Sequence, residues 1–161
     1  MEAHVAISEQ LARLKVLAPA GYAIALHVRF TTPTYLFQTY PKEWIDYYSQ
    51  NGLVMRDPTV LWGFENTGSI RWADLLAVDS DGIIAKAATH GMRFGFTHAI
   101  DVGGSRSLSS FTCGNSDFTD AEIAEIDLLV DSLHRQTAGA KSLPNDVREA
   151  LKGLSIRFTH P

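Results

Sequence analysis

The chain has 161 residues, of which 45% are hydrophobic and 20% charged, a composition typical of one globular domain with a core. Its 18 Asp and Glu outnumber its 14 Lys and Arg, and the net charge of -4 has the wrong sign for a surface that binds DNA phosphates. The single cysteine, Cys113, excludes an internal disulfide. Because the N-terminal sequence lacks signal-peptide features and no long apolar run occurs, we expect a cytoplasmic protein without a membrane segment.

The N-terminal part of the chain predicts a helix followed by a hairpin. Apolar residues at helical spacing predict a helix over 7–17, and strict alternation predicts a strand over 22–30. The sequence TTPT predicts a turn, after which 35–39 forms the second strand. The alternation predicts two faces for the first strand, with Tyr22, Ile24, Leu26, Val28 and Phe30 on one and Ala23, Ala25, His27 and Arg29 on the other.

Two short helices are predicted next. Pro41 suits a first helical turn and Asn51-Gly52 suits a helix end, so 41–51 is expected to be helical. Asp57-Pro58 repeats the start signal for a helix that runs to Phe64. Residues 66–69 are expected to form a loop, and Ile83, Ile84, Ala87, Ala88 and Met92 indicate a further helix.

The last elements complete the predicted fold. Alternation from Phe96 to Val102, the turn residues Gly103-Gly104 and the stretch 105–113 predict a second hairpin. Thr119 and Glu122 form a capping-box pattern that opens a long helix. We expect an α+β fold of the α/β/α sandwich type, in which a central antiparallel sheet is flanked by helices as in PAS and GAF domains. Residues 1–137 would form the domain, and 138–161 have linker composition with an amphipathic stretch over 147–154.

Catalytic chemistry finds little support in the sequence. The six histidines show no paired metal-ligand spacing, and no nucleophile elbow surrounds Ser109 or Ser110. Gly103-Gly104 lies between two strands, where a hairpin turn is more common than a phosphate-binding loop. We therefore expect neither an enzyme nor a cofactor-binding protein.

Small-molecule binding fits the residues better. Tyr40, Trp44 and Tyr48 lie four residues apart and share a helix face, and Asp57 follows. Tyr and Trp offer hydrogen-bond donors and a carboxylate only accepts, so the set matches an amide. The alternative is that Asp57 is an ordinary helix cap and that Trp44 and Tyr48 are core residues.

The ordered set resembles the ligand-binding domain of LuxR-type quorum-sensing regulators. The pattern of that family is Y-x3-W-x3-Y, then D-P nine residues on, then W fourteen residues after the proline, and a later glycine. Tyr40, Trp44, Tyr48, Asp57-Pro58, Trp72 and Gly95 meet these intervals, and the resemblance extends over residues 10–136.

The resemblance implies binding of an N-acyl-homoserine lactone. Trp44 would donate to the lactone carbonyl, Asp57 would accept from the amide N–H, and Tyr40 would donate to the acyl carbonyl. A strand hydroxyl, Ser110 or alternatively Ser109, would assist at the acyl carbonyl. Tyr48 and Trp72 would enclose the ligand, and the candidates for the acyl pocket, which could equally be ordinary core residues, are Tyr35, Phe37 and Val60. Crowding by Tyr35, Phe37, Tyr40 and Phe111 would favour a short, branched or aryl chain.

Two departures from the family pattern bear on this interpretation. Ala99 stands where many members have proline, four residues after the glycine. SLPNDVREAL (142–151) resembles the linker and the start of the C-terminal helix-turn-helix through which such regulators bind DNA, but no turn and basic recognition helix follow it, so this region would be missing or degenerate. The chain would then be the excised sensor part of a homodimeric regulator or a short relative that blocks a full-length partner by mixed dimerisation. A PAS- or GAF-type module for another small molecule is the competing interpretation.

Overall fold

The computed structural model describes residues 2–30, 32–139, 145 and 149. Most of the predicted linker and of the amphipathic stretch over 147–154 therefore lies outside the described residues. Within the described part of the chain, no helix is long and apolar enough to span a membrane.

A single antiparallel sheet forms the centre of the fold, with the strand order β2-β1-β5-β4-β3. Both predicted hairpins are present, and pairing of β1 with β5 joins them. The strands are β1 (Gly21–Arg29), β2 (Thr32–Gln38), β3 (Gly68–Arg71), β4 (Phe94–Val102) and β5 (Ser105–Cys113). The predicted loop over 66–69 is wrong in its second half, because Gly68 and Ser69 pair with β4. The predicted turn at TTPT is also shorter than expected, since β2 is an edge strand and tolerates Pro33.

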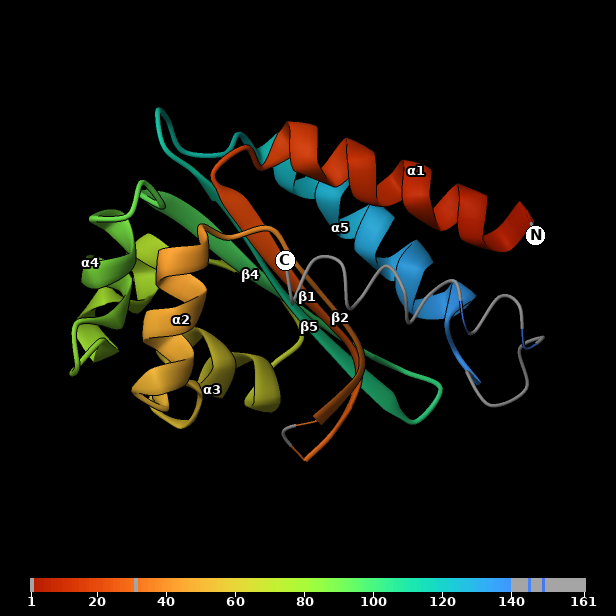
Figure 1. Ribbon diagram of the computed structural model, residues 1–161, viewed down its shortest axis with the longest axis horizontal. Helices are drawn as coiled ribbons and strands as arrows, with labels where there is room; N and C mark the ends of the chain where they lie inside the picture. Colours follow the sequence, from red (N-terminus) through yellow and green to blue (C-terminus); the bar gives the residue numbers. More distant parts are fainter. Residues whose placement is uncertain (1, 31, 140–144, 146–148, 150–161) are drawn as a thin grey trace.

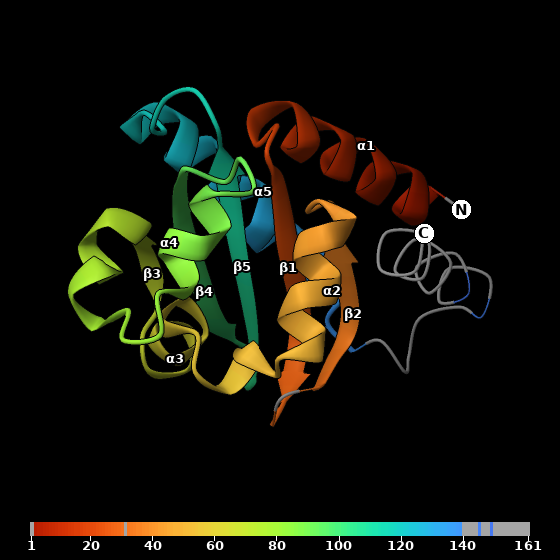
Figure 2. The same ribbon diagram turned by 60° about the vertical axis from the view of Figure 1, so that its left-hand side comes forward.

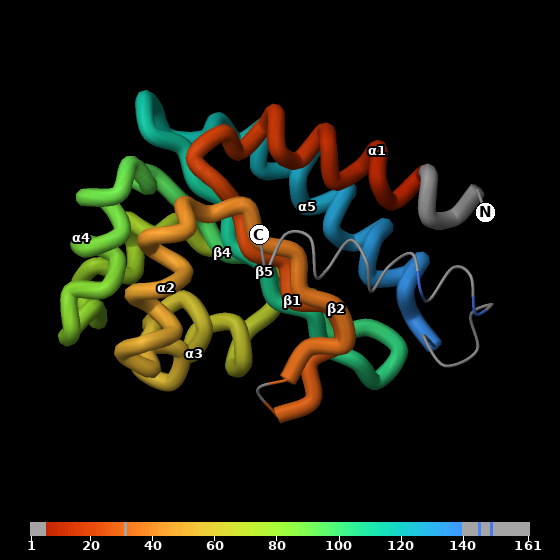
Figure 3. The backbone as a smooth tube through the Cα atoms, in the orientation of Figure 1, coloured from red at the N-terminus to blue at the C-terminus, as the bar shows by residue number. Residues whose placement is uncertain are grey.

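Helices cover both faces of this sheet, which confirms the predicted α/β/α arrangement (Figures 1 and 3). The helices α1 (Glu2–Leu17) and α5 (Asp120–Gln136) lie side by side on one face. Figure 2 looks onto the opposite face. That layer contains α2 (Lys42–Gln50), α3 (Pro58–Glu65), α4 (Ile83–Ala88) and the 3-10 helices η1 (Leu53–Met55) and η2 (Trp72–Val78).

The capping box predicts the start of α5 correctly. The Thr119 hydroxyl accepts from the Glu122 N–H at 3.1 Å, and the Glu122 carboxylate accepts from the Thr119 N–H at 2.8 Å. These two bonds satisfy backbone donors that a helix start leaves without partners. From this start, α5 extends its apolar residues Ile126, Val130 and Leu133 over the sheet.

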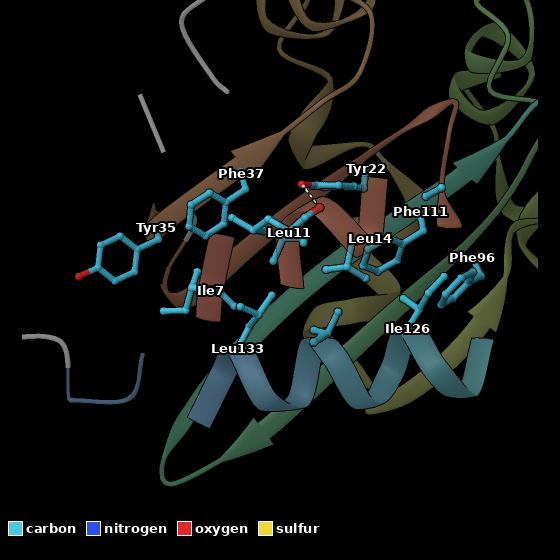
Figure 4. Close-up of a cluster of buried hydrophobic side chains, with 14 of the residues drawn as sticks. Ile7, Leu11, Leu14, Tyr22, Tyr35, Phe37, Phe96, Phe111, Ile126 and Leu133 are labelled. Atoms are coloured by element: carbon cyan, nitrogen blue, oxygen red, sulfur yellow. Dashed lines mark hydrogen bonds between the residues drawn. The ribbon is translucent and has the colours of Figure 1, made fainter. Parts of the chain in front are cut away.

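The main hydrophobic core lies between the sheet and the α1/α5 layer. Figure 4 shows side chains of β1, β2, β4 and β5 meeting those of the two helices. The members of this core are all nearly inaccessible to solvent, and the largest of its completely buried side chains are Tyr22, Phe37, Phe96 and Phe111. This face of the sheet is therefore closed by close packing.

A bulge in β1 changes the predicted faces of that strand. His27 has a φ of 54°, and the pairing of β1 with β5 shifts register between Ala25 and Val28. The extra residue lets His27 follow Leu26 onto the α5 side and turns Val28 toward the α2–α4 side. Phe30, predicted on the face of Tyr22, is 95% exposed at the end of the hairpin.

Candidate ligand-binding site

A cavity of about 570 Å³ lies between the sheet and the α2–α4 layer. Its volume is within the range of small-molecule binding sites. The floor comes from β1, β2 and β5, and the roof comes from the helices. Residues that line it include Ala23, Ala25, Val28, Leu36, Tyr40, Trp44, Tyr48, Asp57, Val60, Trp72, Leu108 and Ser110. Seven of the nine site residues predicted from the sequence line the cavity.

Helix α2 brings the predicted aromatic residues to the cavity. Pro41 precedes the helix, and Trp44 and Tyr48 lie one turn apart on the same face, with ring centroids 5.9 Å apart. Trp44 is 4% exposed, yet its indole N–H has no acceptor within the described residues. The site therefore offers an unpaired donor beside the cavity.

Asp57 is both the N-cap of α3 and a cavity residue. Its Oδ1 accepts from the Thr59 N–H at 2.9 Å and from the Thr59 hydroxyl at 2.7 Å, and its Oδ2 accepts from the Tyr48 hydroxyl at 2.8 Å. A carboxylate has about four acceptor positions, so these three bonds leave one on Oδ2. Asp57 can therefore cap α3 and still present an acceptor position to the cavity.

Burial perturbs the ionisable groups of the site. It raises the pKa of Asp57 above its ordinary value, although hydrogen bonds from Thr59 and Tyr48 oppose the shift. Burial also raises the pKa of Tyr40 and of Tyr48, and the Asp57 charge adds to both shifts. Both phenols are therefore protonated donors at neutral pH. Tyr40 has only a long contact, 3.5 Å from its hydroxyl to the Ser110 carbonyl oxygen.

Trp72 and Ser110 are linked through a buried threonine. The Trp72 indole N–H donates to Thr97 Oγ1 at 3.0 Å, and Thr97 Oγ1 lies 2.7 Å from Ser110 Oγ. The Trp72 ring lies directly on the backbone of Gly95, where an added Cβ would be only 2.5 Å from the ring atom Cδ2. The glycine of the sequence pattern thus makes room for the tryptophan.

Strand pairing distinguishes the two candidate serines. Ser110 pairs with Ala23 and Thr97, so its side chain lies on the cavity face of β5. Ser109 also borders the cavity, but it pairs with Ile24 and His98, whose side chains lie on the α1/α5 face. Its hydroxyl is buried and has no hydrogen-bond partner in the described part of the chain. Of the two serines, Ser110 is therefore the one whose side chain faces the cavity.

Tyr35 and Phe37 do not line the cavity, which corrects the expected acyl pocket. Figure 4 shows both on the α5 side of the sheet, and their exposed fractions are 2% and 0%. Side chains alternate along β2, so the cavity receives Leu36 instead. Phe111 also belongs to the α1/α5 core, and the argument for a short acyl chain loses three of its four residues.

Sequence reasoning missed several cavity residues. Thr59 holds Asp57 through two bonds, and its place two residues after the aspartate was a detectable signal for such a cap. Ala23 and Ala25 were assigned to the second face of β1, and their small side chains leave space there. Leu108 could be assigned to the cavity only once the register of β5 was known. Among the described residues, no group of His, Cys, Asp and Glu is arranged to bind a metal.

Comparison with known proteins identifies relatives over most of the chain. The regulatory protein SdiA of Escherichia coli strain K12 is 29% identical over 107 residues, which cover 66% of this chain and 42% of SdiA. This chain thus spans less than half the length of that relative.

Solved structures share the fold. CepR2 of Burkholderia cenocepacia, an N-acylhomoserine-lactone-dependent LuxR family transcription factor, superposes with a TM-score of 0.60 at 19% identity, over 85% of this chain and 83% of that one. SdiA in complex with octanoyl-rac-glycerol superposes with a TM-score of 0.59 at 21% identity, over 99% of this chain and 62% of that one.

The family model of the autoinducer-binding domain matches residues 17–137. This match covers β1 to β5, the whole cavity and α5. The chain therefore belongs to the autoinducer-binding domain family.

Proposed function

We propose that this domain is the sensor of a quorum-sensing regulator and binds an N-acyl-homoserine lactone in the cavity beneath α2 and α3. The observation that carries the proposal is the juxtaposition, at one cavity, of a donor that has no partner among the described residues and an open acceptor position. The donor is the Trp44 indole N–H, and the acceptor is Asp57 Oδ2. An N-acylated lactone presents the matching groups, an amide N–H and two carbonyls.

Each polar group has a place in the proposed complex. Trp44 donates to the lactone carbonyl, and Asp57 accepts from the amide N–H. Tyr40 and Ser110 donate to the acyl carbonyl, and the long Tyr40 contact leaves its hydroxyl free to turn to the ligand. Tyr48 and Trp72 enclose the ligand, while Val60, Leu36 and Leu108 contact the acyl chain.

Ligand binding would act through stability rather than catalysis. A ligand that binds only the folded state stabilises it by RT ln(1 + [L]/Kd), about 2.7 kcal/mol at a hundredfold excess over Kd. Such a gain is a large fraction of the stability of a typical domain. We infer that the ligand promotes folding and homodimerisation in the bacterial cytoplasm, and that DNA binding belongs to a region outside residues 1–137.

Thermal unfolding with a panel of N-acyl-homoserine lactones of varied acyl chain tests the proposal. At a hundredfold excess over Kd, the gain above corresponds to a saturable rise in Tm of about 5–10 °C for one class of chain. Free homoserine lactone is the control without an acyl chain. Octanoyl-glycerol, which has an ester in place of the amide, tests the need for the N–H group. A folded protein whose Tm no lactone raises would contradict the proposal.

Homodimerisation needs its own measurement. Sedimentation velocity with and without the stabilising lactone should show a dimer that forms more readily when the ligand is bound. If the protein is monomeric under both conditions, the proposal of homodimerisation is wrong, but the proposal of ligand binding is not affected.

A further inference from the structure

Thr97 lies behind the cavity wall and does not line the cavity. Its side chain is completely buried on β4, between Trp72 and Ser110. It occupies the row of residues that crosses the sheet through Ser110 and Ala23. Since it cannot touch a ligand in the cavity, any effect of Thr97 on binding must pass through a neighbour.

The hydrogen-bond inventory fixes the direction of the protons around Thr97. The Trp72 indole can only donate, so Thr97 Oγ1 accepts that bond. Within the described residues, the Thr97 hydroxyl proton has one available acceptor, Ser110 Oγ at 2.7 Å. In the reverse arrangement, Ser110 would donate to Thr97 and leave the Thr97 proton buried without an acceptor, which costs free energy.

We propose that Thr97 is a positioning residue that makes Ser110 a hydrogen-bond donor toward the cavity. Trp72 donates to Thr97, Thr97 donates to Ser110, and the Ser110 proton then points to the cavity that Ser110 lines. The chain of bonds selects an acceptor, such as a carbonyl oxygen, at this position. This inference rests on the proposed function for the identity of the acceptor, but the direction of the protons is independent of it.

The ligand-free protein tests the direction of the protons. Ser110→Ala should lower Tm by about 2–4 °C or more, because it leaves the buried Thr97 proton without an acceptor. Ser109→Ala is the matched control on the neighbouring position. Its hydroxyl already has no partner among the described residues, so this substitution should not lower Tm. An unchanged Tm in Ser110→Ala would overturn the proposal.

Binding of N-octanoyl-homoserine lactone tests the positioning role. Thr97→Val keeps the shape but removes the hydroxyl, and it should raise Kd roughly 2- to 13-fold, the range for one neutral hydrogen bond. Thr97→Ser keeps the hydroxyl and should restore the wild-type Kd. The thioamide analogue, whose sulfur is a weak acceptor, should be affected much less by Thr97→Val.

The outcomes separate the two proposals. Equal weakening of both compounds by Thr97→Val would reduce Thr97 to a packing residue and overturn the inference. Thr97→Val also leaves the Trp72 N–H without its acceptor. If that variant does not fold, Ser110→Ala takes its place: the change in Kd from wild type is measured for the lactone and for its thioamide analogue. Equal weakening of both compounds would again overturn the inference. Absence of lactone binding to the folded wild-type protein would refute the proposed function, whereas the Tm of Ser110→Ala would still decide the proton direction.

Discussion

Asp57 combines two roles that a substitution can separate. Its carboxylate caps α3, and it also presents an open acceptor position to the cavity. Burial raises its pKa in the folded protein, so the ionised form at neutral pH is a cost to the ligand-free fold. The stabilising contribution of a group with a raised pKa is present below its unfolded pKa and is lost as pH rises through the folded value.

Asp57→Asn should therefore weaken binding without weakening the fold. Asn is as good an N-cap as Asp, and its amide can donate to the Tyr48 oxygen. We expect the free energy of unfolding at pH 7 to stay the same or rise. Ligand affinity should fall by roughly 1.5–3 kcal/mol, or about 10- to 150-fold in Kd, because a hydrogen bond to a charged group is lost.

Calorimetry and urea unfolding of the same samples check this prediction. Asp57→Ala is the comparison variant, because it removes the cap as well as the charge and should lower stability. If Asp57→Asn binds with the wild-type Kd, the aspartate is a helix cap and no more.

At the scale of elements, two histidines connect β1 to the end of α5. The rings of His27 and His134 lie 4.4 Å apart, and His27 Nε2 donates to the His134 carbonyl oxygen at 3.0 Å. The Ser105 hydroxyl donates to His27 Nδ1 at 2.7 Å, and the Ser107 hydroxyl donates to His134 Nδ1 at 2.6 Å. Burial and the neighbouring His134 lower the pKa of His27, although its bond to the His134 backbone opposes the shift.

The stability of the domain should consequently fall in mild acid. With the pKa of His27 below its unfolded value of about 6.5, the unfolded chain binds more protons than the folded one. The stabilising contribution is thus present above pH 6.5 and declines as pH falls toward the folded pKa. His27→Asn should give a flatter profile, since Asn tolerates the left-handed backbone at this position.

Urea unfolding between pH 5 and 8 measures this dependence. The difference between wild type and His27→Asn isolates the contribution of His27 from that of the other titrating groups. Parallel profiles for the two proteins would show that the histidine contact does not sense pH.

The elements differ in how well the sequence predicted them. Alternation and turn residues located both hairpins, and the Thr119 capping box located α5. The bulge in β1 was not predictable, because its left-handed residue is His27 rather than a glycine. At the site, the aromatic spacing and Asp57-Pro58 predicted the cavity residues of α2 and α3. Thr97 escaped prediction because its partner Trp72 lies 25 residues away and only the sheet register brings them together.

At the scale of the whole molecule, the two layers of helices are packed differently. The α1/α5 layer closes on a filled core, whereas the α2–α4 layer covers a cavity of about 570 Å³. Missing contacts on one side lower the cost of local opening there. The α2–α4 layer should be the part of the molecule that a ligand orders.

Hydrogen exchange followed by mass spectrometry should show this asymmetry. At short labelling times, amides of α2 and α3 should exchange faster than those of α1 and α5 in the ligand-free protein. A saturating stabilising lactone should slow exchange mainly in α2 and α3. Equal protection of all four helices at these times would indicate that the ligand acts only on global unfolding.

The alternation of side chains along the strands also bears on how related domains diverge. Leu36 faces the cavity, while its neighbours Tyr35 and Phe37 belong to the opposite core. One strand thus carries two independent sets of constraints at adjacent positions. Under the proposed function, a lineage could exchange Leu36 for a larger or smaller residue and so change which ligand the cavity binds, while the fold is retained. Overall identity between two such domains is then a poor guide to a shared signal, and the cavity-facing positions are the informative ones to compare.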